Sequence, residues 1–259
     1  MKNAIAAVLV AILLTLGLLA GCVGGVVTGS GNLVTEEMDF SGFTRVEAGY
    51  AFEVEITQSD SYSVSITADD NLFEYIQVSK EGETLKIGLK PALSYISTTQ
   101  KAKITMPQLY GLDLSGATRG TVSDFSSTDN IDIEVSGASS LNLVEMSAGD
   151  VEFDISGASR VTGDITAGDA EFDVSGASTV QLEGSANDIV VDASGASHVK
   201  LAAFPVSNAD VTLSGASSGT VNLDGRLDAD LSGASKLSYI GEPTMGTINT
   251  SGASTLSKK

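Results

Sequence analysis

The sequence predicts an all-β fold, a single-stranded parallel β-helix (a solenoid), from three observations. The tetrapeptide Ser-Gly-Ala-Ser/Thr recurs eight times at spacings of 18 to 21 residues. Apolar and polar residues alternate on both sides of each copy, and the chain is rich in Gly but has 4 Pro and no Trp. A near-constant period of this size is typical of stacked repeats that cannot fold singly. The leading serines are Ser115, Ser136, Ser156, Ser175, Ser194, Ser214, Ser232 and Ser251.

Each motif is expected to join two strands. Before the serine, apolar residues flank a polar one, as in Phe153-Asp154-Ile155, and the alternation resumes after the motif, as at Val161. This period of two indicates strands with one buried face. The corner glycines would supply a conformation that other residues resist, with the alanine inside the bend and the serines bonded to turn backbone. These glycines are Gly116, Gly137, Gly157, Gly176, Gly195, Gly215, Gly233 and Gly252.

Strands that recur once per coil should pair with their own copies above and below. About eight coils at a strand spacing of roughly 4.8 Å would form a rod on the order of 40 Å long. We expect right-handed winding, because a left-handed solenoid of strict hexapeptides would give repeats in multiples of six. The alternative is an antiparallel β-prism or propeller, although its blades need longer repeats.

The non-repetitive regions are assigned by pattern. Residues 32–105 alternate clearly, as in Phe52-Glu-Val-Glu-Ile56, but lack the motif. They are expected to form a strand-rich N-terminal cap and the first irregular coils, continuous with the repeat β-helix over 106–257, because a solenoid needs atypical ends.

The N-terminus indicates export. Residues 1–21 combine Lys2, an apolar run and a small-residue cleavage site, which is typical of a signal peptide. The sequence Leu-Ala-Gly-Cys resembles a bacterial lipobox and makes Cys22 the lipidation site, with 22–31 as a flexible lipid-anchored tether. The alternative is an uncleaved membrane anchor. As the sole cysteine, Cys22 cannot form an intramolecular disulfide.

The charge of the chain restricts its partners. The chain without the signal has 13 basic and 33 acidic residues, which gives it a formal charge of −20. Such a surface repels nucleic acid and anionic headgroups, so we expect no nucleic-acid partner.

Residues 39–46 read Asp-Phe-Ser-Gly-Phe-Thr-Arg-Val, and Phe-Glu-Val-Glu-Ile and the Leu-Ser-Gly-Ala-type repeats follow. Together they resemble the family of putative auto-transporter adhesins with a head GIN domain, over about residues 32–257. The resemblance implies a parallel β-helix exported to the envelope, with adhesion as the suggested role. The lipobox-like sequence leads us to expect a lipoprotein form of this family.

Two outer faces are candidate sites. One carries carboxylates on adjacent coils, about 5 Å apart, whose repulsion Ca²⁺ or a polycation would relieve. The alternative is a solvated face that keeps the rod soluble. The candidate cation-binding residues are Asp132, Glu134, Glu152, Asp154, Glu171, Asp173, Asp192, Asp228 and Asp230.

The other face carries hydroxyls, amides and bases four and six positions after each leading serine. It could bind sugar polymers, a regular surface or an ice-like water layer, or could be ordinary strand surface. The pairs are Arg119/Thr121, Ser140/Asn142, Arg160/Thr162, Thr179/Gln181, His198/Lys200, Ser218/Thr220, Lys236/Ser238 and Thr255/Ser257.

An enzyme is not expected, and the prediction includes no catalytic residue and no cofactor other than a candidate Ca²⁺. Gly215-Ala-Ser-Ser-Gly219 fits a nucleophile elbow but equals the repeat, and nothing orients His198 as a base. The near-constant coil length also leaves no room for the walls of a cleft.

The leading hypothesis is therefore a non-enzymatic, lipid-anchored envelope rod that binds an unknown extracellular or envelope polymer or protein. The second is a structural envelope-organising protein that associates end to end through exposed Ile248 and Leu256. A carbohydrate-active enzyme is the third.

Overall fold

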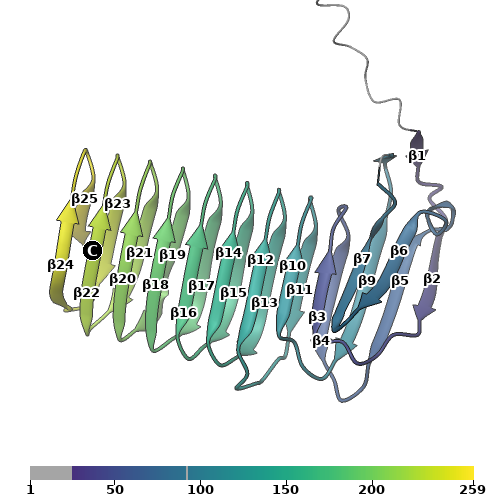
Figure 1. The fold of residues 1–259 in the computed structure, drawn as a ribbon, viewed down its shortest axis with the longest axis horizontal. Helices are drawn as coiled ribbons and strands as arrows, with labels where there is room; N and C mark the ends of the chain where they lie inside the picture. Colours follow the sequence, from purple (N-terminus) through teal and green to yellow (C-terminus); the bar gives the residue numbers. More distant parts are fainter. Residues whose placement is uncertain (1–24, 92) are drawn as a thin grey trace, which may run out of the picture.

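The computed structural model describes residues 25–91 and 93–259, and two long sheets run along it side by side (Figure 1). The eleven-stranded sheet comprises, in spatial order, β6 (Ile76–Glu81), β7 (Thr84–Leu89), β3 (Arg45–Ala48), β10 (Gly111–Leu114), β12 (Ile131–Val135), β14 (Val151–Ile155), β16 (Ala170–Val174), β18 (Asp188–Ala193), β20 (Asn208–Leu213), β22 (Arg226–Leu231) and β24 (Thr244–Thr250). The twelve-stranded sheet comprises β2 (Leu33–Met38), β5 (Ser63–Asp69), β9 (Gln100–Met106), β4 (Glu53–Gln58), β11 (Arg119–Ser123), β13 (Ser140–Ser147), β15 (Arg160–Thr166), β17 (Thr179–Ser185), β19 (His198–Val206), β21 (Ser218–Leu223), β23 (Lys236–Ile240) and β25 (Thr255–Lys258).

From β10 onward each motif joins a strand of the eleven-stranded sheet to the next strand of the twelve-stranded sheet. Every coil therefore contributes one strand to each sheet. Neighbouring coils pair in parallel and in register, for example Phe153 with Phe172 and Val161 with Val180. All pairing from β10 to β25 is parallel, which excludes the antiparallel prism or propeller. The predicted parallel β-helix is confirmed.

The core fills the space between the two sheets. The apolar positions flanking each motif point inward, and Phe153 and Phe172 are both fully buried. Their rings stack with centroids 5.0 Å apart and an interplanar angle of 2°. In the last coil, Ile248 and Leu256 are half-buried against the core rather than exposed as expected, because they continue the inward rows.

The corner contains one departure from the sequence expectation. The alanine of the motif is exposed, and the final serine or threonine lies inside instead, as at Ser197 and Ser217. The hydroxyl of Ser217 donates to the carbonyl oxygens of Ser214 (2.8 Å) and Ala193 (3.1 Å). Turn carbonyls that face inward need a donor, and serine supplies one where alanine cannot.

In the cap, the first two coils are stacked in the opposite order to their order in the chain. The coil β3–β4 pairs with β10–β11, and the later segment β7 to β9 forms the coil outside it. Strand β9 thus lies between β4 and β5, and β7 lies between β3 and β6. Antiparallel β2, β5 and β6, with the short 3₁₀-helix Asp70–Leu72, complete this end of the rod.

The predicted signal peptide and Cys22 lie outside the described residues. Within the predicted tether, β1 (Val26–Thr28) is a strand paired in parallel with β8 (Ser94–Ile96), and Val27 is buried. Its β-branched residues favour this extended form. Among the described residues, no helix is long and apolar enough to span a bilayer.

Candidate functional site

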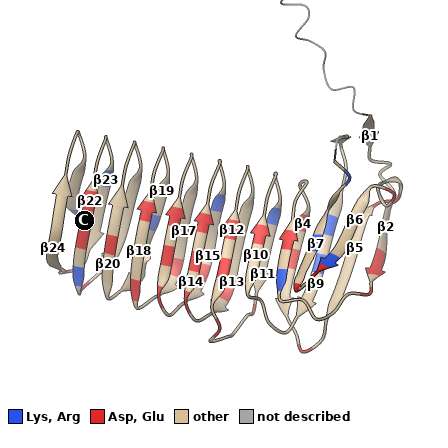
Figure 2. Ribbon diagram, viewed as in Figure 1, with Lys and Arg blue, Asp and Glu red and all other residues tan. Residues whose placement is uncertain are grey.

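The acidic face is the outer side of the eleven-stranded sheet, where carboxylates follow one another from coil to coil (Figure 2). One row runs through Glu134, Asp154, Asp173 and Asp192. A second row contains Asp132, Glu152 and Glu171. Candidates Asp228 and Asp230 lie farther along, beyond β20, where Asp210 and Thr212 occupy the same rows. The structure thus brings seven candidates onto adjacent strands and separates the last two.

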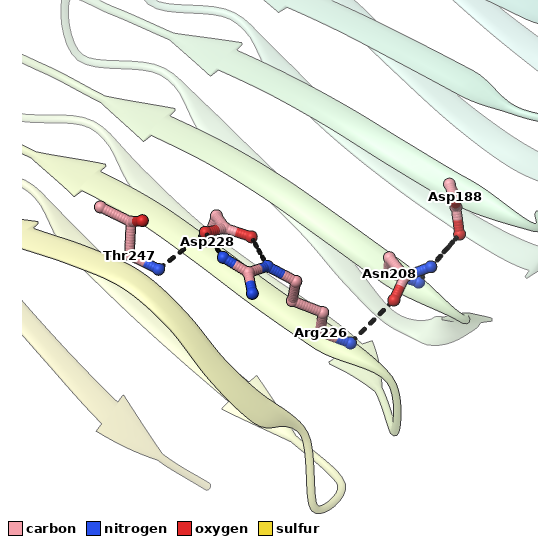
Figure 3. Close-up of polar contacts among 5 residues, drawn as sticks. All are labelled: Asp188, Asn208, Arg226, Asp228 and Thr247. Atoms are coloured by element: carbon pink, nitrogen blue, oxygen red, sulfur yellow. Dashed lines mark hydrogen bonds and ion pairs between the residues drawn. The ribbon is translucent and has the colours of Figure 1, made fainter.

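Two of the candidate carboxylates already have a cationic partner. The guanidinium of Arg45 lies 2.6 Å from the carboxylate of Asp132. In Figure 3, the Arg226 side chain spans both carboxylate oxygens of Asp228, with Nη2 2.7 Å from Oδ1, and the backbone N–H of Thr247 donates to the same oxygen. These bonds hold the pKa of Asp228 down at about 2. Asp132 and Asp228 are therefore poor candidates for an added cation.

A further row of carboxylates lies at the start of the same strands and was missed by the sequence analysis. Asp150 accepts from the backbone N–H of Asp169 (2.9 Å), Asp169 from Asp188 (3.2 Å), and Asp188 from Asn208 (3.1 Å). Asn208 in turn accepts from the N–H of Arg226 (2.8 Å), where Figure 3 shows the row ending. The signal was present, because these residues stand six positions before each leading serine.

A shallow groove of about 360 Å³ lies between this row and the row of Asp132. Its lining includes Asp132, Asp150, Glu152, Asp169, Glu171 and Asp188. Yet no three His, Cys, Asp or Glu side chains of the described residues are placed to hold a metal ion together. Parallel strands project their outer side chains side by side rather than toward one point. The groove can gather counterions or polycations by charge alone.

Asp113 is the most perturbed carboxyl on this face. It stands between Glu47 and Glu134 in its row, and its Oδ1 is buried without a hydrogen-bond partner. Burial, then repulsion from Glu134 and Glu47, raises the pKa of Asp113 to about 6, partly opposed by Lys86.

The hydroxyl face is the outer side of the twelve-stranded sheet along two rows from β11 to β25, of whose members Thr179 and Ser238 are buried between their neighbours. One row runs from Arg119 and the other from Thr121, and their members keep register through every coil. The two rows hold hydroxyl, amide and basic side chains and no carboxylate. In a chain of net charge −19, this absence marks the face as chemically distinct.

The motif serines do not form a catalytic arrangement. Ser217, the serine of the elbow-like sequence, is 1% exposed and donates inward to backbone carbonyls. The ring of His198 lies on the outer face, with Nδ1 2.6 Å from the hydroxyl of Ser218. The wall of the coil therefore separates this histidine from Ser217.

Comparison with known proteins supports the resemblance drawn from the sequence. Residues 42–243 match the family described as putative auto-transporter adhesin, head GIN domain. The chain belongs to this family. No curated protein matches the chain.

Several solved structures share the fold. A putative adhesin from Parabacteroides merdae is 19% identical, with a TM-score of 0.85 over 91% of this chain and 99% of that one. A putative adhesin from Parabacteroides distasonis is 20% identical, with a TM-score of 0.84 over 90% of this chain and all of that one. A putative lipid binding protein from Parabacteroides distasonis is 17% identical, with a TM-score of 0.72 over 90% and 99%.

Proposed function

We propose that this head GIN domain protein is an exported, lipid-anchored, non-enzymatic rod that binds an extracellular or envelope polymer through its hydroxyl face. The observation that carries the proposal is the unbroken register of hydroxyl, amide and basic side chains from β11 to β25. A polymer presents the same group at regular intervals, and a solenoid repeats its side chains about every 4.8 Å. The adhesin family and its structural relatives agree with a binding role.

Co-sedimentation of the purified protein with insoluble peptidoglycan, cellulose and chitin tests this function. The variant Thr121→Glu/Thr162→Glu places two carboxylates on the hydroxyl face and should abolish the pelleting of the protein. The matched control Val190→Glu/Thr212→Glu adds the same charge to exposed positions of the acidic face and should pellet like the wild type. Equal loss in both variants, or none in either, would contradict the assignment of the face. Melting temperatures of both variants establish that they fold.

The anchor is tested separately. We expect the wild-type chain to partition into the detergent phase of a Triton X-114 extract, because a diacylated cysteine is strongly apolar. Cys22→Ser should leave the precursor unlipidated. If the Cys22→Ser protein still carried the added mass of the lipid, lipidation at this residue would be excluded.

A further inference from the structure

The hydroxyl face carries a groove beside an irregularity in β19. Between Lys200 and Pro205, four residues of β19 stand opposite a single residue of β21, so that the strand bulges outward. Phe204 returns into the core, where it is fully buried and packs edge-on against Phe172. The side-chain amide of Asn222 donates to the carbonyl of Ala202 (3.1 Å). These two contacts hold the bulge as a fixed ridge.

The ridge borders a groove of about 480 Å³, a size typical of sites for small ligands. Its ridge side carries the short side chains of Ala202 and Ala203, and Ser218 and Thr220 of β21 also line it. The groove therefore has an apolar wall beside a row of hydroxyls, which suits the carbon faces and hydroxyls of a sugar ring.

Two lysines flank the groove from the strands on either side of β21. Lys200 pairs with Thr220, and Lys236 pairs with Ser218, so the two ammonium groups are carried two strands apart, about 10 Å between backbones. Both side chains are exposed, and neither takes part in an ion pair among residues 25–91 and 93–259. Lys259 also lines the groove, and Glu183 is the one carboxylate side chain among the described residues of its lining.

We propose that this groove binds an acidic sugar unit, one carrying a carboxylate, sulfate or phosphate, within an extracellular polysaccharide. Lysine ammonium groups bind such anions as point charges, and the hydroxyls of Ser218 and Thr220 can bond either the anion or its ring. The two rows continue on both sides of the groove, so a chain can extend along the face. This inference rests on the proposed function and specifies the ligand chemistry.

Binding of fluorescent dextran sulfate, polygalacturonate and uncharged dextran to the purified protein, by fluorescence anisotropy, tests the inference. We expect both anionic polymers to bind, with affinity falling as salt rises, and uncharged dextran to bind more weakly. Lys200→Gln/Lys236→Gln should raise the Kd for the anionic polymers about tenfold or more. The control Lys80→Gln/Lys90→Gln removes the same charge near the cap and should leave the Kd unchanged.

The remaining outcomes separate the two proposals. Unchanged affinity in Lys200→Gln/Lys236→Gln would overturn the groove as the site. Binding of insoluble neutral polymers without binding of either anionic one would overturn this inference and leave the proposed function standing. No binding of any polymer would overturn both. Vesicles of phosphatidylglycerol serve as a further probe. Binding to these vesicles alone, with none to the sulfated or carboxylated polymer, would identify a membrane as the ligand and overturn the sugar assignment.

Discussion

Phe153 and Phe172 carry more buried apolar surface than the other residues in their rows, and their stacked rings join two coils. Phe153→Ala should lower the free energy of unfolding by roughly 3–5 kcal/mol, because it leaves a cavity that the fixed coils cannot close. Chemical denaturation measures this loss. Val190→Ala, at a 49%-exposed position of the same sheet, should cost less than about 0.5 kcal/mol. Similar losses in the two variants would mean that the inward register is wrong.

Asp113 makes the stability of the rod depend on pH. Because its pKa is raised to about 6 in the folded state, the folded protein holds the proton more tightly than the unfolded chain does. This contribution to stability is complete below about pH 4 and is lost as pH rises through 6.

Asp113→Asn removes that titration. Above pH 7 the variant should be more stable than the wild type, on the order of 1 kcal/mol after allowance for solvent screening. Melting curves between pH 4.5 and 8 measure the difference. Asp154→Asn, in the same row, removes equal charge and serves as the control. If Asp113→Asn has no greater effect than this control, the buried carboxyl is not the cause of the pH dependence.

At the scale of the element, the corner is a ladder of glycines. Each corner glycine has a positive φ between 70° and 76°, and in every coil but the last its carbonyl accepts from the alanine N–H of the next coil, as from Ala177 to Gly157 at 2.7 Å. A Cβ at Gly176 would stand 2.3 Å from that same carbonyl oxygen. The repeat therefore needs glycine both for its backbone conformation and for the close approach of neighbouring coils.

Gly176→Ala tests both requirements together, the positive φ and the close approach of the neighbouring coil. We expect a loss of about 3 kcal/mol or more, since a clash with backbone adds to the strain of a positive φ. Gly82→Ala is the control: its φ is 61°, but nothing lies within 4 Å of the added Cβ, so strain acts alone at about 1–2 kcal/mol. Urea unfolding compares the two. Equal losses would show that the coils separate enough to accept a methyl group.

At the scale of the whole molecule, the two sheets give the rod two different electrostatic surfaces. The acidic face repels itself along its length, and its carboxylates point outward in parallel. Divalent cations should therefore stabilise the fold by gathering along the face rather than in one cage.

Millimolar Ca²⁺ should raise the melting temperature, and Mg²⁺ should raise it by a similar amount, because screening does not depend on coordination geometry. Differential scanning fluorimetry at fixed ionic strength measures both shifts. Asp154→Asn/Asp173→Asn should reduce the two shifts together. A shift with Ca²⁺ alone, lost in this variant, would instead demonstrate a specific calcium site.

The cap shows where sequence patterns stop being sufficient. The alternation in residues 52–56 predicts a strand, which β4 confirms. No local signal predicts that β9 lies between β4 and β5, because that placement depends on pairing with residues between 32 and 48 positions away. The reversal of the cap coils therefore required the tertiary structure.

The sequence by itself determined the repeat, the inward rows of apolar residues and the two outer faces, because each follows from a short pattern copied once per coil. Only the tertiary structure decided that Asp132 is neutralised, since Arg45 reaches it across an intervening strand. It also decided that the final serine, not the alanine, turns inward at the corner, and that β19 bulges to form a groove. A period specifies which residues recur, whereas the direction and partners of a side chain are set by neighbours that lie a full coil or more away in the chain.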